Sequence, residues 1–179
     1  MTCVAEPSAK LGLRLRPPRL DEEAAFRAAQ ATMDAEGWPF AFDVGPDTRW
    51  SDFLRRLDRQ RCGLDLPDGW VPTTYLIADV GGQIVGRTSI RHELNEFLAR
   101  EGGHIGYAVL PEHRRRGHAT EILRQSLTVA RAVGIDRVLI TCDDTNTGSI
   151  KVIEACGGRL ESLIEPATGG IPKRRYWID

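Results

Sequence analysis

The stretch YAVLPEHRRRGHAT, which runs from Tyr107 to Thr120, is the most informative part of this chain. It opens with apolar residues typical of a strand, which Pro111 ends, and continues through a basic loop to Gly117. A helix N-terminus offers unpaired N–H groups and a positive dipole end, and a glycine there lets a phosphate approach the backbone closely. The stretch therefore predicts a strand, an anion-binding turn and a helix, in that order. A solvated basic loop before a helix is the alternative interpretation.

The segments after this stretch predict further helices and strands. Apolar residues recur at helical spacing from Gly117 to Val133, and Gly134 is a typical stop. A short β-branched run, Arg137 to Cys142, is expected to be a central strand buried on both faces. Asn146 to Ala155 reads as a helix. The last two strands are expected at 159–164 and 173–178, with turn residues between them.

The segments before it predict a strand, two helices and a hairpin. Leucines alternate with other residues from Leu11 to Leu15, which is the period of a half-buried strand. Helices are expected from Asp21 to Gly37 and from Ser51, as N-cap, to Arg61. The remaining strands are expected at 73–80 and 83–91, joined by a Gly81-Gly82 turn, and at 104–110. The element order indicates an α/β (α+β) fold in a single domain, 1–179.

Composition narrows the class of protein. The chain has 179 residues, 41% of them hydrophobic, and a net charge of -1, so no global field favours nucleic acid or an anionic membrane. Neither a secretory signal nor a long apolar segment is evident, and a cytoplasmic location is the default expectation. No metal is expected, because the cysteines and histidines lack ligand spacing. These residues are Cys3, Cys62, Cys142, Cys156, His92, His104, His113 and His118. The cysteines in apolar segments are expected to be buried and reduced.

Arg114-x-x-Gly117-x-Ala119, placed after a strand, resembles the acetyl-coenzyme A signature of the GNAT superfamily of N-acetyltransferases. The resemblance is specific over 105–158 and implies a mixed, mostly antiparallel sheet of six to seven strands flanked by about four helices. It also implies that the amides of 115–120 hold the pyrophosphate and that strand 107–109 pairs with the pantetheine arm. A bulge in that strand is expected to aim the amide near Val109 or Leu110 at the thioester oxygen.

A second match is Asn146, which opens a helix where family members place an asparagine that contacts the cofactor. It is also a good N-cap, and the two roles are compatible. The closing residues RRYWI, together with IRHELN and GGHIGY, look like a branch known mainly as predicted acetyltransferases. By resemblance, the cofactor-binding residues are Tyr107, Ala108, Val109, Leu110, Arg114, Arg115, Arg116, Gly117, His118, Ala119, Thr120, Asn146 and Ser149.

The chain departs from the family at two catalytic positions. Ile153 stands where many members have a tyrosine acid, and Thr141 stands where some have a glutamate base. Ser149 and Tyr176 are the substitute acids we consider, and His92, Glu93 and His104 are the candidate bases because their strands border the acceptor side. For each of them a surface or structural role is the competing interpretation. Asp143 and Asp144 are expected to be turn residues.

The resulting hypothesis is an enzyme that transfers acetyl from acetyl-coenzyme A to a primary amine by direct attack in a ternary complex. The alternative is a non-catalytic module that senses acyl-coenzyme A, and a nucleic-acid-binding role for HRRRGH is disfavoured by the near-neutral charge. Four aromatic residues could form the acceptor pocket or simply pack a loop: Trp38, Phe40, Phe42 and Trp50. The acceptor is left open between peptide, lysine, polyamine, antibiotic and amino-acid amines, and a homodimer is among the expected assemblies.

Overall fold

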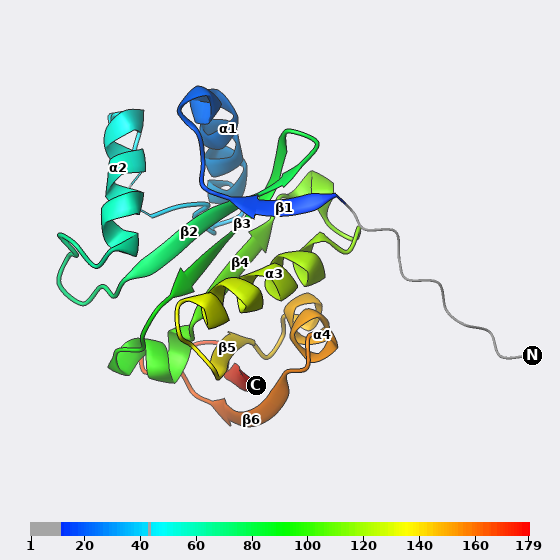
Figure 1. Cartoon of the computed structure of the whole chain (residues 1–179). Helices are drawn as coiled ribbons and strands as arrows, with labels where there is room; N and C mark the ends of the chain where they lie inside the picture. Colours follow the sequence, from blue (N-terminus) through cyan, green and yellow to red (C-terminus); the bar gives the residue numbers. More distant parts are fainter. Residues whose placement is uncertain (1–11, 43) are drawn as a thin grey trace, which may run out of the picture.

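A computed structural model describes residues 12–42 and 44–179 (Figure 1). Leu11 and Cys3 lie outside the described residues. The strands are β1 (Leu13–Arg16), β2 (Thr73–Val80), β3 (Gln83–Arg91), β4 (Ile105–Val109), β5 (Val138–Asp143), β6 (Arg159–Ile164) and β7 (Lys173–Ile178). The α-helices are α1 (Glu23–Asp34), α2 (Trp50–Arg61), α3 (His118–Ala132) and α4 (Thr147–Ala155). Short helical turns are η1 (Leu20–Glu22), η2 (Leu98–Gly102) and η3 (Pro111–His113).

The strands form two antiparallel sheets, with the orders β1-β2-β3-β4 and β5-β7-β6. The predicted fold class is confirmed, and β2, β3, β6 and β7 have the predicted bounds. Gly81 and Gly82 turn the β2–β3 hairpin with φ angles of 59° and 88°, which glycine adopts without strain. One expectation for β5 was wrong: the strand is largely buried, but it pairs only with β7 and lies at the edge of the smaller sheet.

Tertiary packing shifts the start of α2 from its predicted position. Ser51 was expected to be the N-cap, but the helix begins at Trp50 and its N-cap is Arg49, which makes no side-chain capping bond. The Trp50 ring is buried beside Phe53, and its Nε1 donates to the carbonyl of Arg19. Burial of the indole therefore extends the helix by a residue that capping preferences alone would leave outside. The polar stretch before β4 also contains a turn, η2, whose Leu98 is buried.

Helices cover both faces of the larger sheet (Figure 1). On one face, Leu123 and Leu127 of α3 pack with Ile90 and Ile105. On the other face, α1 and α2 contribute an apolar cluster that packs against β2 and includes Phe26, Phe40, Trp50, Phe53 and Ile77. The Phe26 ring centroid lies 5.3 Å from Phe40 and 5.0 Å from Trp50. Each face of β4 thus belongs to a different part of the core.

The two sheets meet at the start of β4 and then diverge. The His104 amide donates to the Leu139 carbonyl at 2.7 Å, and the Leu139 amide donates to His104 Nδ1 at 2.9 Å. Gly103 makes this approach feasible, because a Cβ there would lie 2.7 Å from the Leu139 carbonyl oxygen and its φ is +63°. Beyond this point β4 pairs only with β3, which leaves its other edge open toward β5.

Candidate functional site

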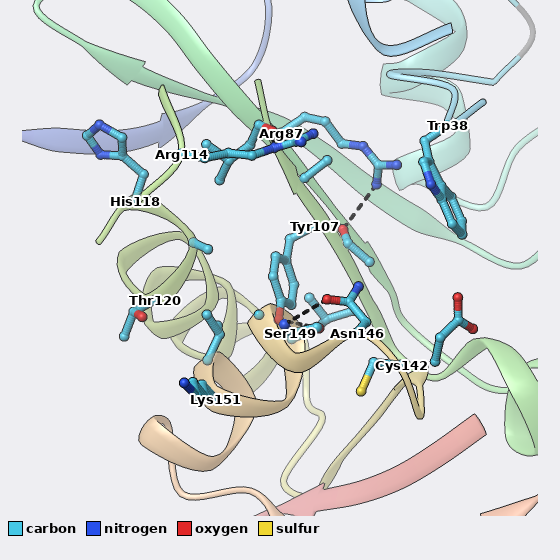
Figure 2. Close-up of a pocket in the computed structure, with 18 of the residues that line it drawn as sticks. Trp38, Arg87, Tyr107, Arg114, His118, Thr120, Cys142, Asn146, Ser149 and Lys151 are labelled. Carbon is cyan, nitrogen blue, oxygen red and sulfur yellow. Dashed lines mark hydrogen bonds between the residues drawn. The ribbon is translucent and has the colours of Figure 1, made fainter. Parts of the chain in front are cut away.

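A cleft of about 810 Å³ lies between the diverging strands β4 and β5 and is bounded by the first turns of α3 and α4 (Figure 2). Most of the predicted cofactor residues line it: Tyr107, Ala108, Val109, Arg114, Arg115, Gly117, His118, Ala119, Thr120, Asn146 and Ser149. Leu110 and Arg116 do not. The other lining residues include Met33, Glu36, Trp38, Arg87, Gly106, Cys142, Lys151 and the ion pair Asp143–Lys173.

The wall formed by β4 presents free backbone groups to the cleft. One backbone hydrogen bond lies at each end of the β3–β4 ladder. The Leu110 amide donates to the Val85 carbonyl at 2.9 Å, and the Arg91 amide donates to the His104 carbonyl at 2.8 Å. Because alternate residues of an antiparallel strand bond to the partner strand, the N–H groups of Ile105, Tyr107 and Val109 point away from β3. An extended ligand therefore finds an unpaired strand edge in the cleft.

This register decides between the two predicted amides. Leu110 donates inward to Val85, whereas Val109 directs its N–H into the cleft. The expected bulge in β4 is absent from its ladder with β3, where the register is uninterrupted. The irregularity lies instead between β2 and β3, at Ala78/Asp79.

The loop between β4 and α3 collects unpaired donors at the end of that edge. Arg115 and Gly117 adopt left-handed φ angles of 61° and 80°. Within 12–42 and 44–179, the amides of 115–120 donate to no backbone or side-chain acceptor. Since these amides also carry the positive end of the α3 dipole, the turn has the donors and the field that an anion would need.

Arg114 links this loop to the segment that follows α1. Its Nε donates to the Val109 carbonyl at 3.0 Å, and its two terminal nitrogens bind the carboxylate of Glu36. The guanidinium is therefore largely engaged within the protein. His118 is buried, and its Nδ1 has no hydrogen-bond partner among the described residues. Burial, together with the charges of His113 and Arg116, lowers the pKa of His118, so the ring is neutral.

The opposite wall comes from the start of α4. Asn146 is its N-cap, and its side-chain oxygen accepts the Ser149 amide at 3.0 Å while the residue also lines the cleft. The Tyr107 hydroxyl reaches across from β4 and lies 2.8 Å from Ser149 Oγ (Figure 2). Burial raises the pKa of Tyr107, so its hydroxyl keeps its proton. Two hydroxyl groups thus meet inside the cleft.

The other predicted catalytic residues do not line this cleft. His92 Nε2 is bonded to Thr74 Oγ1 at 2.8 Å, and Glu93 is exposed. His104 uses Nδ1 to accept the Leu139 amide. Tyr176 is fully buried in the smaller sheet, where its hydroxyl donates to Glu154 at 3.2 Å.

The four aromatic residues divide between the two roles considered from the sequence, packing and lining of a pocket. Phe40 and Trp50 are 0% and 4% exposed and belong to the core, because α1 and α2 close over them. Trp38 is 59% exposed and lines the cleft, and the exposed Phe42 ring packs edge-on against Trp70. Among the described cysteines, Cys142 is buried at the cleft, Cys156 is half-buried and Cys62 is exposed, and all three are free thiols.

Metal and membrane features were also sought in the described ranges. There, no group of three or more His, Cys, Asp or Glu side chains is arranged to hold a metal ion. No helix in the same ranges combines the length and apolarity needed to cross a membrane.

An open strand edge that ends in a turn of unpaired amides suits proteins of a particular class. Such proteins bind a long, extended ligand that carries an anionic group between its two ends. A family model described as an acetyltransferase (GNAT) domain matches residues 12–159. The chain therefore belongs to the GNAT family of acetyltransferases. No curated protein matches the sequence.

Solved structures share the fold at low sequence identity. RimJ from Mycobacterium smegmatis, in complex with CoA-disulfide, has a TM-score of 0.69 and 21% identity, with 93% of this chain and 81% of that chain covered. RimL, a ribosomal L7/L12 alpha-N-protein acetyltransferase with coenzyme A, has a TM-score of 0.65, 18% identity and 94% coverage of each chain. The microcin C7 self-immunity acetyltransferase MccE, with acetyl-CoA and AMP, has a TM-score of 0.64 and 17% identity, with 93% and 92% covered.

Proposed function

We propose that this protein transfers the acetyl group of acetyl-coenzyme A to a primary amine, which attacks the thioester directly in a ternary complex. The observation that carries the proposal is the continuity of the free β4 edge with the unpaired amides of 115–120. An amide-bearing pantetheine arm matches the edge, and a pyrophosphate matches the turn. RimJ and MccE, which share the fold, bind CoA-disulfide and acetyl-CoA.

The chain supplies an oxyanion donor in this proposal. The Val109 amide points away from β3 into the cleft, on the strand edge along which the pantetheine arm would lie. It would donate to the thioester oxygen as negative charge develops there during attack. Because the amide is fixed by the β3–β4 ladder, no reorganisation is needed at that moment.

Ser149 is our proposed acid for the leaving thiolate, with Tyr107 as its positioning partner. Of the two acids considered from the sequence, only Ser149 lines the cleft. The Tyr107 hydroxyl lies 2.8 Å from Ser149 Oγ, and either oxygen can be the donor. With the tyrosine as donor, the serine proton points away from Tyr107 and can move to sulfur. Ile153 cannot serve here, because its apolar side chain is fully buried.

Calorimetric titration with acetyl-coenzyme A tests the cofactor site directly. We expect wild type to bind, and we expect Gly117→Trp to lose binding because a bulky side chain at φ 80° distorts the turn. Asn146→Ala is expected to weaken binding. Arg124→Trp, an exposed change on α3, is the matched control and retains affinity.

Thiol release in the presence of a panel of amines then separates an enzyme from a sensor. Amine-dependent release supports the proposal. Tight binding without release from any amine would favour the sensor alternative, and absence of binding by wild type would refute the proposed function itself.

A further inference from the structure

Two arginines of β3 lie at or beside the cleft: Arg87 lines it, Arg91 does not, and neither has an acidic partner in the described ranges. Arg87 and Arg91 are four positions apart on one strand, so their side chains leave the same face as Ser89. That face packs under α1 and α2, away from α3, and Ala108, the β4 partner of Arg87, lies on it. Within the described parts of the chain, neither guanidinium has a carboxylate within 4.0 Å.

The two head groups converge over Gly106 of β4. A Cβ built on Gly106 would lie 3.6 Å from Arg87 Nη1, 3.6 Å from Arg91 Nη2 and 3.3 Å from Ser89 Oγ. Two like charges and a hydroxyl thus surround a point that glycine leaves empty. The φ of Gly106 is not in the left-handed region, so backbone conformation does not require the glycine. The missing side chain instead leaves room between the arginines.

Neutral carbonyl groups satisfy only part of this donor set. Arg87 donates to the Gly106 and Pro39 carbonyls, both at 3.2 Å, and its Nε is buried with no partner among the described residues. Arg91 Nη1 donates to the Gly102 and Gly103 carbonyls, both at 3.0 Å. Burial lowers the pKa of both arginines, and Arg87 adds to the effect on Arg91, whose pKa is about 10. Charges held this way are costly unless an anion completes the site.

The position of this pair relates it to the acetyl-transfer site. Arg87 lies opposite Ala108, next to Val109, and lines the cleft together with Gly106 and Trp38. Figure 2 shows the Arg87 head group between β4 and the Trp38 ring. With a rise of about 3.3 Å per residue, an anion over Gly106 lies roughly 10 Å or less from the Val109 amide. A small molecule can span this separation.

We infer that the amine acceptor carries a carboxylate near its amine, as a free amino acid does, and that Arg87 and Arg91 bind this carboxylate over Gly106. The inference rests on the proposed function and narrows its substrate class. A planar carboxylate can accept N–H bonds from guanidinium groups, and Arg87 Nη1 and Arg91 Nη2 are the donors nearest the space over Gly106. Trp38 borders the site, where the remainder of the acceptor can lie against its ring.

Matched pairs of acceptors test the inference. Thiol release from acetyl-coenzyme A is measured with a panel of L-amino acids and with the α-carboxamide of each. We expect kcat/KM to be about 10- to 100-fold higher for the best acid than for its carboxamide, since hydrogen bonds to charged groups are worth this much. The preference should fall mainly through KM in Arg87→Met and Arg91→Met, recover in part in Arg87→Lys, and weaken in Gly106→Ala, whose methyl group occupies the site. Arg124→Met, at an exposed position on α3, should retain it.

The outcomes distinguish this inference from the function beneath it. Thiol release with carboxamides, simple amines or peptides that equals or exceeds release with amino acids overturns the inference and leaves acetyl transfer intact. If no amine supports release, the proposed function fails. Calorimetric titration of the L-amino-acid panel into protein with acetyl-coenzyme A then tests whether the carboxylate site exists, independently of catalysis. Binding that Arg87→Met abolishes would support the site, and no binding by wild type would overturn it.

Discussion

The Tyr107–Ser149 contact joins side chains from two different elements, one on each wall of the cleft. The tyrosine comes from β4 and the serine from the first turn of α4, and their oxygens lie 2.8 Å apart. Family members that have a tyrosine on the helix carry it at the position of Ile153, which this chain buries completely. In this chain the hydroxyl beside Ser149 is that of Tyr107, on the opposite wall of the cleft.

Removing the serine hydroxyl should slow turnover without weakening the cofactor site. We expect Ser149→Ala to lower kcat about 100-fold, a typical contribution of a general acid, because the leaving thiolate loses its proton donor. Tyr107→Phe should have a smaller effect. Thiol release gives kcat, and calorimetry should show nearly unchanged affinity for acetyl-coenzyme A. Ser51→Ala, at an exposed position on α2, is the control. An unchanged kcat in Ser149→Ala would remove the serine from the mechanism.

At the scale of elements, the close packing of β3 on β4 fixes the geometry of the open edge. A Cβ at Gly86 would lie 2.4 Å from the Ala108 carbonyl oxygen and 3.1 Å from Ile122 Cδ1. The first of these atoms is backbone, so it can yield only if the strands move. The direction of the Val109 amide depends on the same pair of strands.

Gly86→Ala should consequently destabilise the fold and disturb the cofactor site together. We expect a loss of about 1–3 kcal/mol in the free energy of unfolding, the usual cost of overpacking a core. Urea denaturation provides this measurement, and acetyl-coenzyme A titration reports the site. Gly45→Ala is the matched control, because its nearest neighbour would be Thr48 Oγ1 at 3.9 Å. Equal stability of the two variants would show that the strands accommodate the methyl group.

At the scale of the whole molecule, acid should weaken the fold through its histidines. Burial is the main cause that lowers the pKa of His92, His104 and His118. The folded protein therefore resists protonation at these rings, whereas the unfolded chain protonates them near pH 6.5. Their contribution to stability is present above about pH 6.5 and is lost as the pH falls below it. His104 joins the two sheets, so its protonation matters most to the assembly of the fold.

His104→Asn should flatten this pH dependence. The asparagine oxygen can accept the Leu139 amide in place of Nδ1 and does not titrate in this range. Between pH 7.5 and 5.5 the variant should lose about 1 kcal/mol less stability than wild type, within the limit of about 1.4 kcal/mol per pH unit for one group. Urea denaturation at the two pH values checks the difference. Parallel losses in both proteins would contradict the role assigned to His104.

The parts of the fold that could be predicted from sequence are those set by local pattern. Runs of residues that favour strands, split by the Gly81-Gly82 turn, were enough to give the bounds of β2 and β3. The start of α2 and the edge position of β5 were not predictable in this way, because they depend on the burial of Trp50 and on where β7 pairs. Long-range packing, invisible in a local pattern, decides both.

The residues of the candidate site also divide into those that a local pattern predicts and those that depend on long-range packing. The backbone-based part, from Tyr107 to Thr120, follows from a contiguous motif and lines the cleft almost throughout. Side-chain roles were less accessible to prediction: the His104 ring bonds to Leu139, thirty-five positions away in sequence. Arg87 was overlooked, although a basic residue within a largely buried strand is a signal that could have pointed to it.

The open edge of β4 also bears on how the protein avoids self-association. An exposed strand edge invites pairing with another polypeptide, which is a route to aggregation. Here the edge lies inside a cleft walled by α3, α4 and β5, so an incoming β-sheet meets these walls before it reaches the edge. The divergence of the two sheets thus leaves the unpaired backbone groups of β4 accessible to a ligand. The same walls shield these groups from pairing with a strand of another protein molecule.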